Sequence, residues 1–195
     1  HTLFNPKGIA VIGASTHPGK FGFVALHNIL ASGFDGNIFA TNPKMPEILG
    51  IQTLKSVDRI PKDSIDVAMI CLGPKQTIAV LPELAEKGIK AGFVVSGGFR
   101  ESGAEGVELE HELVQVANSL GITIAGPNGQ GFVSTPANLC SQIVSPYPPM
   151  GNISIASQSG NILSAMLNLS RAKNIGIARA ISIGNQAQLG VADYI

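Results

Sequence analysis

The stretch Lys7–Gly22, KGIAVIGASTHPGKFG, decides the fold of this 195-residue chain. Its apolar run Ile9–Ile12 is unbroken, as expected for a strand that is covered on both faces of a sheet. Gly13 follows directly, and further glycines lie in the turn that leads to a helix beginning near Phe21. A helix N-terminus behind a buried strand offers free backbone N–H groups and the positive end of the helix dipole. The stretch therefore predicts a phosphate-binding turn.

The same alternation of buried strand and helix continues to about residue 126. Further strands are predicted at 37–40, 66–72, 91–95 and 122–125, and helices at 21–31, 76–87 and around the apolar stripe 109–120. Pro82 falls inside the second helical pattern, where it is expected to kink the helix or reset its start. Strands that alternate with helices imply a parallel sheet with right-handed crossovers. The predicted fold class is α/β, with a Rossmann-like doubly wound sheet.

A second unit begins after a stretch in which this pattern lapses. Residues 1–130 are predicted to form the first domain, 131–150 a proline-containing linker and 151–195 the start of a second domain. In the last part we expect a strand at 152–156, a helix at 161–172 and a strand at 177–183. Two strands and one helix cannot bury a core alone, so the second domain is expected to be truncated or completed by something else.

Composition narrows the class of protein. Hydrophobic residues make up 45% and charged residues 13%, which favours a well-buried α/β protein over a disordered chain. The net charge is zero, so there is no electrostatic case for nucleic acid or an anionic membrane as partner. No apolar run approaches the roughly 18 residues of a membrane span, and no signal peptide is visible. The two isolated cysteines lack a CxxC spacing and are expected to be reduced thiols, which agrees with a cytoplasmic location.

The predicted strand ends indicate which ligand the sheet could bind, because open parallel sheets bind ligands beyond their carboxyl ends. The five ends are nearly uncharged: GAS at 13–15, TNPK at 41–44, LGP at 72–74, SGG at 96–98 and PN at 127–128. NAD is disfavoured because the turn lacks GxG and the second strand lacks the acid that binds the ribose. Coenzyme A fits better, since Lys44 suits its ribose phosphate. A solvated lysine and ordinary tight turns remain the alternatives.

Other chemistries receive little support. The segment Gly13–Gly19 is one residue too long for a P-loop, and Phe21 stands where Ser or Thr is required. The four histidines are scattered without metal-ligand spacing, so no metal site is predicted. A GxSxG motif is missing, which disfavours a serine hydrolase. The turn Ser157–Gly160, SQSG, precedes a helix, where Ser159 is either a simple N-cap or part of a second phosphate site.

Several motifs resemble the first two domains of the ADP-forming acyl-CoA synthetases, which belong to the succinyl-CoA synthetase superfamily. They occur in the same order over essentially the whole chain: FNPKGIAVIGAS, NPK, VSGGF, GPNGQGF, IASQSG and ISIGNQAQLGVADYI. The resemblance implies a CoA-binding Rossmann-like domain followed by the N-terminal part of a flavodoxin-like domain. It also implies these CoA-binding residues: Gly13, Ala14 and Ser15 at the phosphates, Lys44 near the nucleotide, Leu72 and Pro74 along the adenine, Ser96 and Gly97 along the pantetheine, and Asn128 near the thiol.

The resemblance further implies a reaction. In that family ATP, a carboxylic acid and CoA give acyl-CoA, ADP and phosphate by way of an acyl phosphate and a phosphohistidine. The helix N-terminus that receives the phosphohistidine would be Ser157, Gln158, Ser159 and Gly160. No catalytic residue is expected in this chain, since the phosphohistidine is expected beyond Ile195. ATP or ADP and Mg are expected only with an ATP-grasp domain or subunit, in an oligomer.

One position departs from the family pattern. The family commonly has GPNCxG, and Gly129 stands here in place of that cysteine, so an essential thiol is not required at this position. The chain alone is expected to bind CoA without completing a turnover. The alternatives are a stand-alone CoA-binding or CoA-sensing module and the CoA-binding region of a protein acyltransferase.

Overall fold

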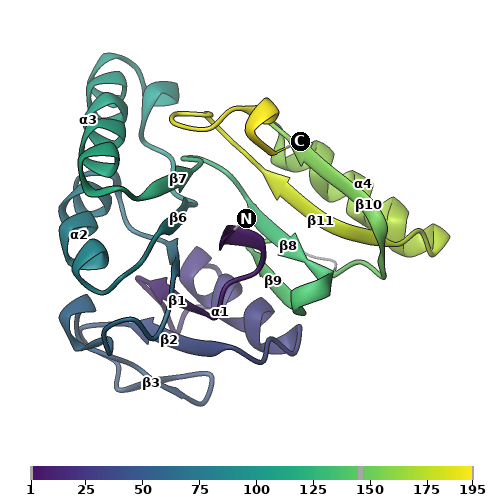
Figure 1. Cartoon of the computed structure of the whole chain (residues 1–195), viewed down its shortest axis with the longest axis horizontal. Helices are drawn as coiled ribbons and strands as arrows, with labels where there is room; N and C mark the ends of the chain where they lie inside the picture. Colours follow the sequence, from purple (N-terminus) through teal and green to yellow (C-terminus); the bar gives the residue numbers. More distant parts are fainter. Residues whose placement is uncertain (1, 145–146, 195) are drawn as a thin grey trace.

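A computed structural model describes residues 2–144 and 147–194 of the chain. Its first sheet, here sheet A, has five parallel strands in the order β2-β1-β5-β6-β7 (Figure 1). The strands are β1 Gly8–Ile12, β2 Asn37–Thr41, β5 Val67–Ile70, β6 Ala91–Val94 and β7 Thr123–Ala125. Strand β1 lies between β2 and β5. The connection from β1 to β2 and the later connections therefore run in opposite directions along the sheet and lie on opposite faces of it.

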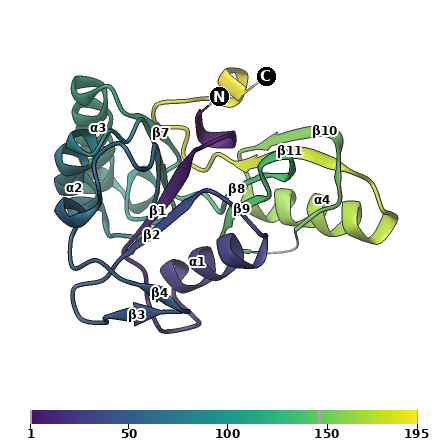
Figure 2. The same cartoon turned by 60° about the horizontal axis from the view of Figure 1, so that its bottom comes forward.

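Helices cover both faces of sheet A. Helix α1, Phe21–Ala31, lies on one face, and α2, Pro74–Glu86, and α3, Ala104–Leu120, lie on the other (Figures 1 and 2). Side chains of β1 alternate between two hydrophobic clusters: Ile9 and Val11 pack with α1, whereas Ala10 and Ile12 pack with α2 and α3. The doubly wound α/β prediction is therefore confirmed.

Two helices begin earlier than their patterns predicted. Helix α2 runs without restart from Pro74 through Pro82, so of the two expected effects of Pro82 the reset of the helix start was wrong. Pro74 holds the first helical turn, where the missing N–H costs nothing. Helix α3 starts at Ala104, because Gly106 allows the first turn to lie against the chain at Phe99: an added Cβ would be 1.9 Å from the Phe99 carbonyl oxygen.

A second sheet, sheet C, has the order β10-β11-β8-β9 (Figure 1). Strands β10, Met150–Ser157, and β11, Ile177–Ser182, are parallel and joined by helix α4, Gly160–Lys173. Strands β8, Gly131–Ser134, and β9, Leu139–Gln142, form an antiparallel hairpin that pairs with β11. The stretch expected to be only a linker thus contributes two strands to the second sheet. Pro146, which was part of that expectation, lies outside the described residues.

The β8–β9 hairpin contributes to the cores on both of its sides. Phe132 packs against Phe93 of sheet A, with ring centroids 5.9 Å apart. On the other side Val133 and Cys140 pack with Leu163 of α4. The hairpin therefore supplies apolar surface that two strands and one helix lacked, and it joins the second sheet to the first.

Short elements complete the fold. The hairpin β3, Glu47–Ile48, and β4, Ile51–Gln52, follows β2. Single 3-10 turns occur at η1 Thr2–Phe4, η2 Val57–Arg59, η3 Arg100–Ser102, η4 Thr135–Ala137 and η5 Val191–Tyr194. Turns η1 and η5 lie side by side (Figure 2), with the rings of Phe4 and Tyr194 6.5 Å apart. None of the helices formed by residues 2–144 and 147–194 has the length and hydrophobicity needed to cross a bilayer.

Candidate functional site

The turn after β1 is held tightly against the helix that follows it. Gly13 has φ +87°, a left-handed conformation that favours glycine. Gly22 in the first turn of α1 lies so close that an added Cβ would be 2.1 Å from the Gly13 carbonyl oxygen. Lys20 is the N-cap residue of α1, and its side chain makes no capping hydrogen bond. The helix therefore presents an uncapped N-terminus beside the strand end, as the opening stretch predicted.

Asn42 joins the ends of β1 and β2. Its Nδ2 donates to the Ala14 carbonyl over 2.8 Å, and its Oδ1 accepts from the backbone N–H groups of Lys44 (2.8 Å) and Met45 (2.9 Å). The backbone N–H of Gly13 donates to Oγ1 of Thr41 over 3.2 Å. These contacts fix the predicted phosphate turn relative to the loop that carries Lys44. Asn42 belongs to the predicted strand end TNPK at 41–44, but this role was not predicted for it.

The remaining predicted CoA residues continue the same edge of sheet A. Leu72 lies against Gly13, at 2.8 Å from the position a Cβ would take there. A Cβ added to Gly98 would be 2.9 Å from Cγ of Pro74, and a Cβ added to Gly97 would be 3.3 Å from Oδ1 of Asn128. Asn128 also donates its backbone N–H to the Ser96 carbonyl over 3.1 Å. The structure thus brings these predicted residues together as one continuous arc across the carboxyl ends of the strands.

Gln130 extends this arc to the second sheet. Its Nε2 donates to Oδ1 of Asn161 over 3.3 Å, and its Oε1 accepts from Oγ of Ser164 over 2.8 Å. A Cβ on Gly160 would be 2.3 Å from Cδ of Gln130. The segment GPNGQG therefore contacts both the arc and the first turns of α4. Sequence reasoning missed Gln130, although it stands two residues after the predicted Asn128.

The SQSG turn caps α4 with its own side chains. Oγ of Ser159 accepts from the N–H of Ile162 over 3.3 Å, which is the N-cap bond expected from sequence. Oγ of Ser157 donates to the Ser159 carbonyl over 2.9 Å and accepts from the Ser159 N–H over 3.2 Å. Gln158 is exposed at the tip of the turn. The N-cap and phosphate alternatives are compatible, because only one of the free N–H groups of α4 is used by Ser159.

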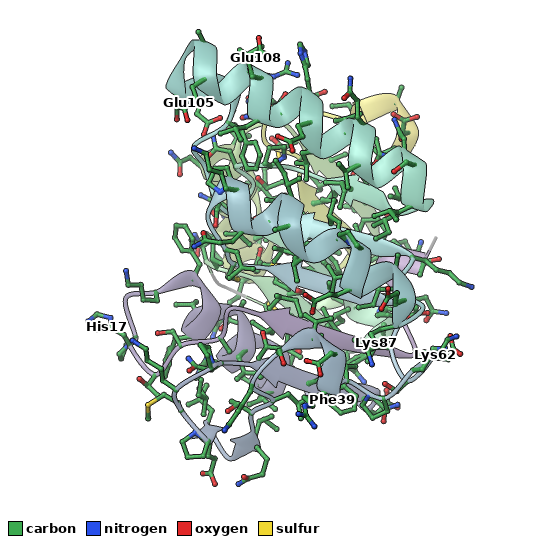
Figure 3. The ribbon with its side chains drawn as sticks, turned by 90° about the vertical axis from the view of Figure 1, so that its left-hand side faces the viewer. His17, Phe39, Lys62, Lys87, Glu105 and Glu108 are labelled. Carbon is green, nitrogen blue, oxygen red and sulfur yellow. The ribbon has the colours of Figure 1, made fainter. Side chains whose placement is uncertain are left out.

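The charges along the arc lie in its exposed loops. Lys44 and Lys20 are exposed, and His17 points away from the body of the protein (Figure 3). Nδ1 of His17 accepts from the Gly19 N–H over 3.0 Å, so this ring takes part in the local turn. Burial raises the pKa of the Cys71 thiol to about 12, which keeps it protonated at neutral pH. No group of three or more His, Cys, Asp or Glu side chains suited to a metal gathers in residues 2–144 and 147–194.

One buried carboxylate was not foreseen. Glu110 of α3 is only 1% exposed, and no role was predicted for it. It follows the buried Gly106 by four residues and precedes Leu113 by three, so it lies on the buried face of the helix. Arg100 pairs with it through two guanidinium nitrogens. This helical spacing was the signal that could have revealed its burial.

One cavity lies away from the arc. It has a volume of about 820 Å³ and is lined by residues of β6, β7, β10 and β11 together with η1 and η5. Lys90, Thr123 and Arg179 are on its walls, and none of the predicted CoA or phosphate residues is. The candidate site therefore rests on the strand ends and helix N-termini and not on this cavity.

Comparisons with known proteins agree along the whole chain. A model of the CoA binding domain matches residues 7–135, and a model of the succinyl-CoA ligase like flavodoxin domain matches residues 150–195. An ADP-forming acetate–CoA ligase I of Archaeoglobus fulgidus is 37% identical over 99% of this chain and 28% of its own length. The alpha subunit of the ADP-forming acetate–CoA ligase I of Pyrococcus furiosus is 38% identical over 99% of this chain and 42% of its own.

A solved structure is similar throughout. The dinucleotide forming acetyl-coenzyme A synthetase 1 of Ca. Korarchaeum cryptofilum, in complex with phosphate and ADP, superposes with a TM-score of 0.93 at 37% identity. The match covers 99% of this chain and 41% of that one. The chain therefore spans less than half the length of these two ligases and of this solved structure.

Proposed function

This chain belongs to the CoA-binding domain family, and from that premise we propose that it is the CoA-binding portion of an ADP-forming acid–CoA ligase. The complete enzyme would couple ATP, a carboxylic acid and CoA to acyl-CoA, ADP and phosphate, through an acyl phosphate and a phosphohistidine. The observation that carries the proposal is the continuous arc of small and uncharged residues from the β1 turn to Asn128, which Gln130 extends to the N-terminus of α4.

The arc is suited to CoA in its length and its charge. Two segments without charged side chains, at Ser96–Gly97 and Asn128, offer a path for the neutral pantetheine arm and its thiol, and the uncharged Leu72–Pro74 suits the adenine. At its other end the uncapped N-terminus of α1 and the exposed Lys44 suit phosphates. The second strand ends without the carboxylate that NAD requires. We assign Gly13, Ala14, Ser15 and Lys44 to the phosphate-bearing nucleotide on this basis.

The second helix N-terminus would then take a different phosphate. Ser157–Gly160 leads into α4, and Gln130 connects this turn to the proposed thiol end of CoA. A phosphoryl group delivered there would lie near the thiol that consumes the acyl phosphate. We propose that the phosphohistidine and an ATP-grasp partner with ATP and Mg come from parts of the enzyme that these 195 residues do not include. We also propose that the complete enzyme is an oligomer and that it is located in the cytoplasm.

Calorimetry with CoA, dephospho-CoA and NAD tests the ligand assignment. We expect CoA to bind most tightly, dephospho-CoA about tenfold more weakly, and NAD not to bind. Lys44→Ala should remove most of the difference between CoA and dephospho-CoA. Lys62→Ala is the matched control, because Lys62 lies at the opposite end of the molecule from the loop that carries His17 (Figure 3). Binding of NAD without binding of CoA would overturn the proposed function.

The ligase activity requires the complete enzyme. We expect the chain alone to release no ADP from ATP, acetate and CoA, and the full-length protein that contains it to form acetyl-CoA or the thioester of another acid. Acetate is the first acid to test, because the relatives above are named for it. CoA binding by the chain together with no ligase activity of the full-length protein on any acid would favour a CoA-binding module.

A further inference from the structure

Asn185 lies where the two parts of the fold meet and uses its whole carboxamide. Its Nδ2 donates to Oε2 of Glu101 over 2.6 Å and to Oε2 of Glu110 over 2.8 Å. Its Oδ1 accepts from Nδ2 of Asn128 over 3.4 Å. Both amide hydrogens and the amide oxygen are therefore directed at residues of the first unit. Its backbone is held there too, since its N–H donates to the Pro127 carbonyl over 2.8 Å.

The two carboxylates connect Asn185 to the arc. Oε1 of Glu101 accepts from the backbone N–H groups of Gly98 (2.5 Å) and Phe99 (3.2 Å), which closes the turn that follows β6. Glu110 is buried in α3 and is neutralised by Arg100. Because one amide nitrogen bonds both carboxylates, Asn185 also keeps two negative groups at a fixed separation. A side chain without donors would leave these carboxylates facing each other.

Asn128 is the third partner. It holds a left-handed backbone conformation with φ +61°, and its side chain approaches Gly97. The turn at Gly97–Gly98 and the Asn128 carboxamide are the surfaces proposed for the pantetheine arm and the thiol end. Asn185 is bonded to both: to the Asn128 carboxamide directly, and to the Gly97–Gly98 turn through Glu101.

We propose that Asn185 is a positioning residue that aligns the Gly97–Gly98 turn with Asn128 and so selects for the pantetheine arm of CoA. This inference rests on the proposed function. Asn185 also belongs to the segment that follows β11, so the position of sheet C and the shape of the pantetheine path are mechanically linked. The nucleotide end of the arc, at Gly13 and Lys44, has no bond to this network among the contacts of the described residues.

Two ligands separate the two ends of the arc: CoA, and adenosine 3′,5′-bisphosphate, which lacks the pantetheine arm. For Asn185→Ala we expect the Kd for CoA to rise about tenfold while the Kd for the bisphosphate stays within twofold. Asn185→Asp has the same shape without donors and adds a third carboxylate, so its loss should be at least as large. Retained bisphosphate binding shows that each variant is folded.

Gln188→Ala is the matched control in the same segment. Gln188 accepts from the Ile124 N–H in β7 and donates to the Ile122 carbonyl and to Asn118. Among the described residues it makes no hydrogen bond to the turn or to Asn128. It should leave the ratio of the two Kd values unchanged. CoA binding that Asn185→Ala leaves intact, or an equal loss of both ligands, would overturn this inference alone. An unchanged chain that binds no CoA would overturn the proposed function and this inference with it.

Discussion

Replacing Gly22 by alanine tests whether the phosphate turn and α1 are built as one unit. In an ordinary helix the change would stabilise the protein by about 0.5–1 kcal/mol. Here the added Cβ would be 2.1 Å from the Gly13 carbonyl oxygen and 3.0 Å from Cα of Ala14. Cβ atoms essentially never approach other atoms below 3.0 Å, so helix and turn must separate by about 1 Å.

Such overpacking against backbone typically costs about 1–3 kcal/mol. We expect Gly22→Ala to lower the free energy of unfolding by about 2 kcal/mol, which for a chain of this size lowers the Tm by about 4–8 °C. Urea unfolding followed by circular dichroism measures the first quantity, and calorimetry with CoA should show weaker binding because the turn has moved.

Gly19→Ala is the control within the same loop. Its Cβ would be 3.1 Å from Cε1 of the exposed His17, whose ring can move at the cost of one exposed hydrogen bond from the Gly19 N–H. Its effect should stay within about 0.5 kcal/mol. If Gly22→Ala proved as stable as Gly19→Ala and bound CoA equally well, the close contact between α1 and the β1 turn would not be what shapes the site.

Three further changes test separate features. Thr41→Val should cost about 1–2 kcal/mol in urea unfolding, because it leaves the Gly13 N–H without its acceptor, whereas Thr41→Ser should restore most of that loss. Pro82→Ala should stabilise the chain by about 1 kcal/mol by adding an N–H donor inside α2; a loss of stability would contradict this. Partial burial raises the pKa of Glu101, but the bonds from Asn185, Gly98 and Phe99 outweigh it and leave that pKa below its usual value. The resulting stability is present above the unfolded pKa of about 4.3 and is lost as the pH falls through the folded pKa. Glu101→Gln should therefore be less stable than the unchanged chain at pH 7, and the difference should shrink below about pH 4; a constant difference would contradict this.

The strands of sheet A could be predicted because their signals are local. Each is an apolar run of the right length that ends in glycine, proline or a small polar residue, and its partners in the sheet follow from the alternation with helices. The strand ends then named the candidate site, since all five ends of a parallel sheet meet at one edge. The strands of sheet A could therefore be predicted because the signal for each lies in residues that are neighbours in the sequence.

The β8–β9 hairpin was missed because its signal is weak and its partners are distant. It buries polar side chains as well as apolar ones, among them Ser134 and Ser141, so it lacks a clear hydrophobic alternation. Strand β8 pairs with β11, which follows it by more than forty residues, and no feature of the local sequence predicts that pairing. The hydrogen bonds of Asn185 could not be predicted for the same reason, because its partners Glu101 and Glu110 are 84 and 75 residues away in the sequence.

Gly129 shows how a departure from the family pattern can be understood from its surroundings. A Cβ at this position would be 2.4 Å from the Ser182 carbonyl oxygen and 2.6 Å from Cζ of Phe93. Both neighbours are fixed, since Ser182 belongs to β11 and Phe93 is packed against Phe132 in the shared core. The chain has no room for a cysteine side chain here unless sheet C moves away from sheet A. The glycine therefore belongs to the close approach of the two sheets. A thiol is not needed to account for it, because the close contacts with Ser182 and Phe93 already favour a residue without a side chain.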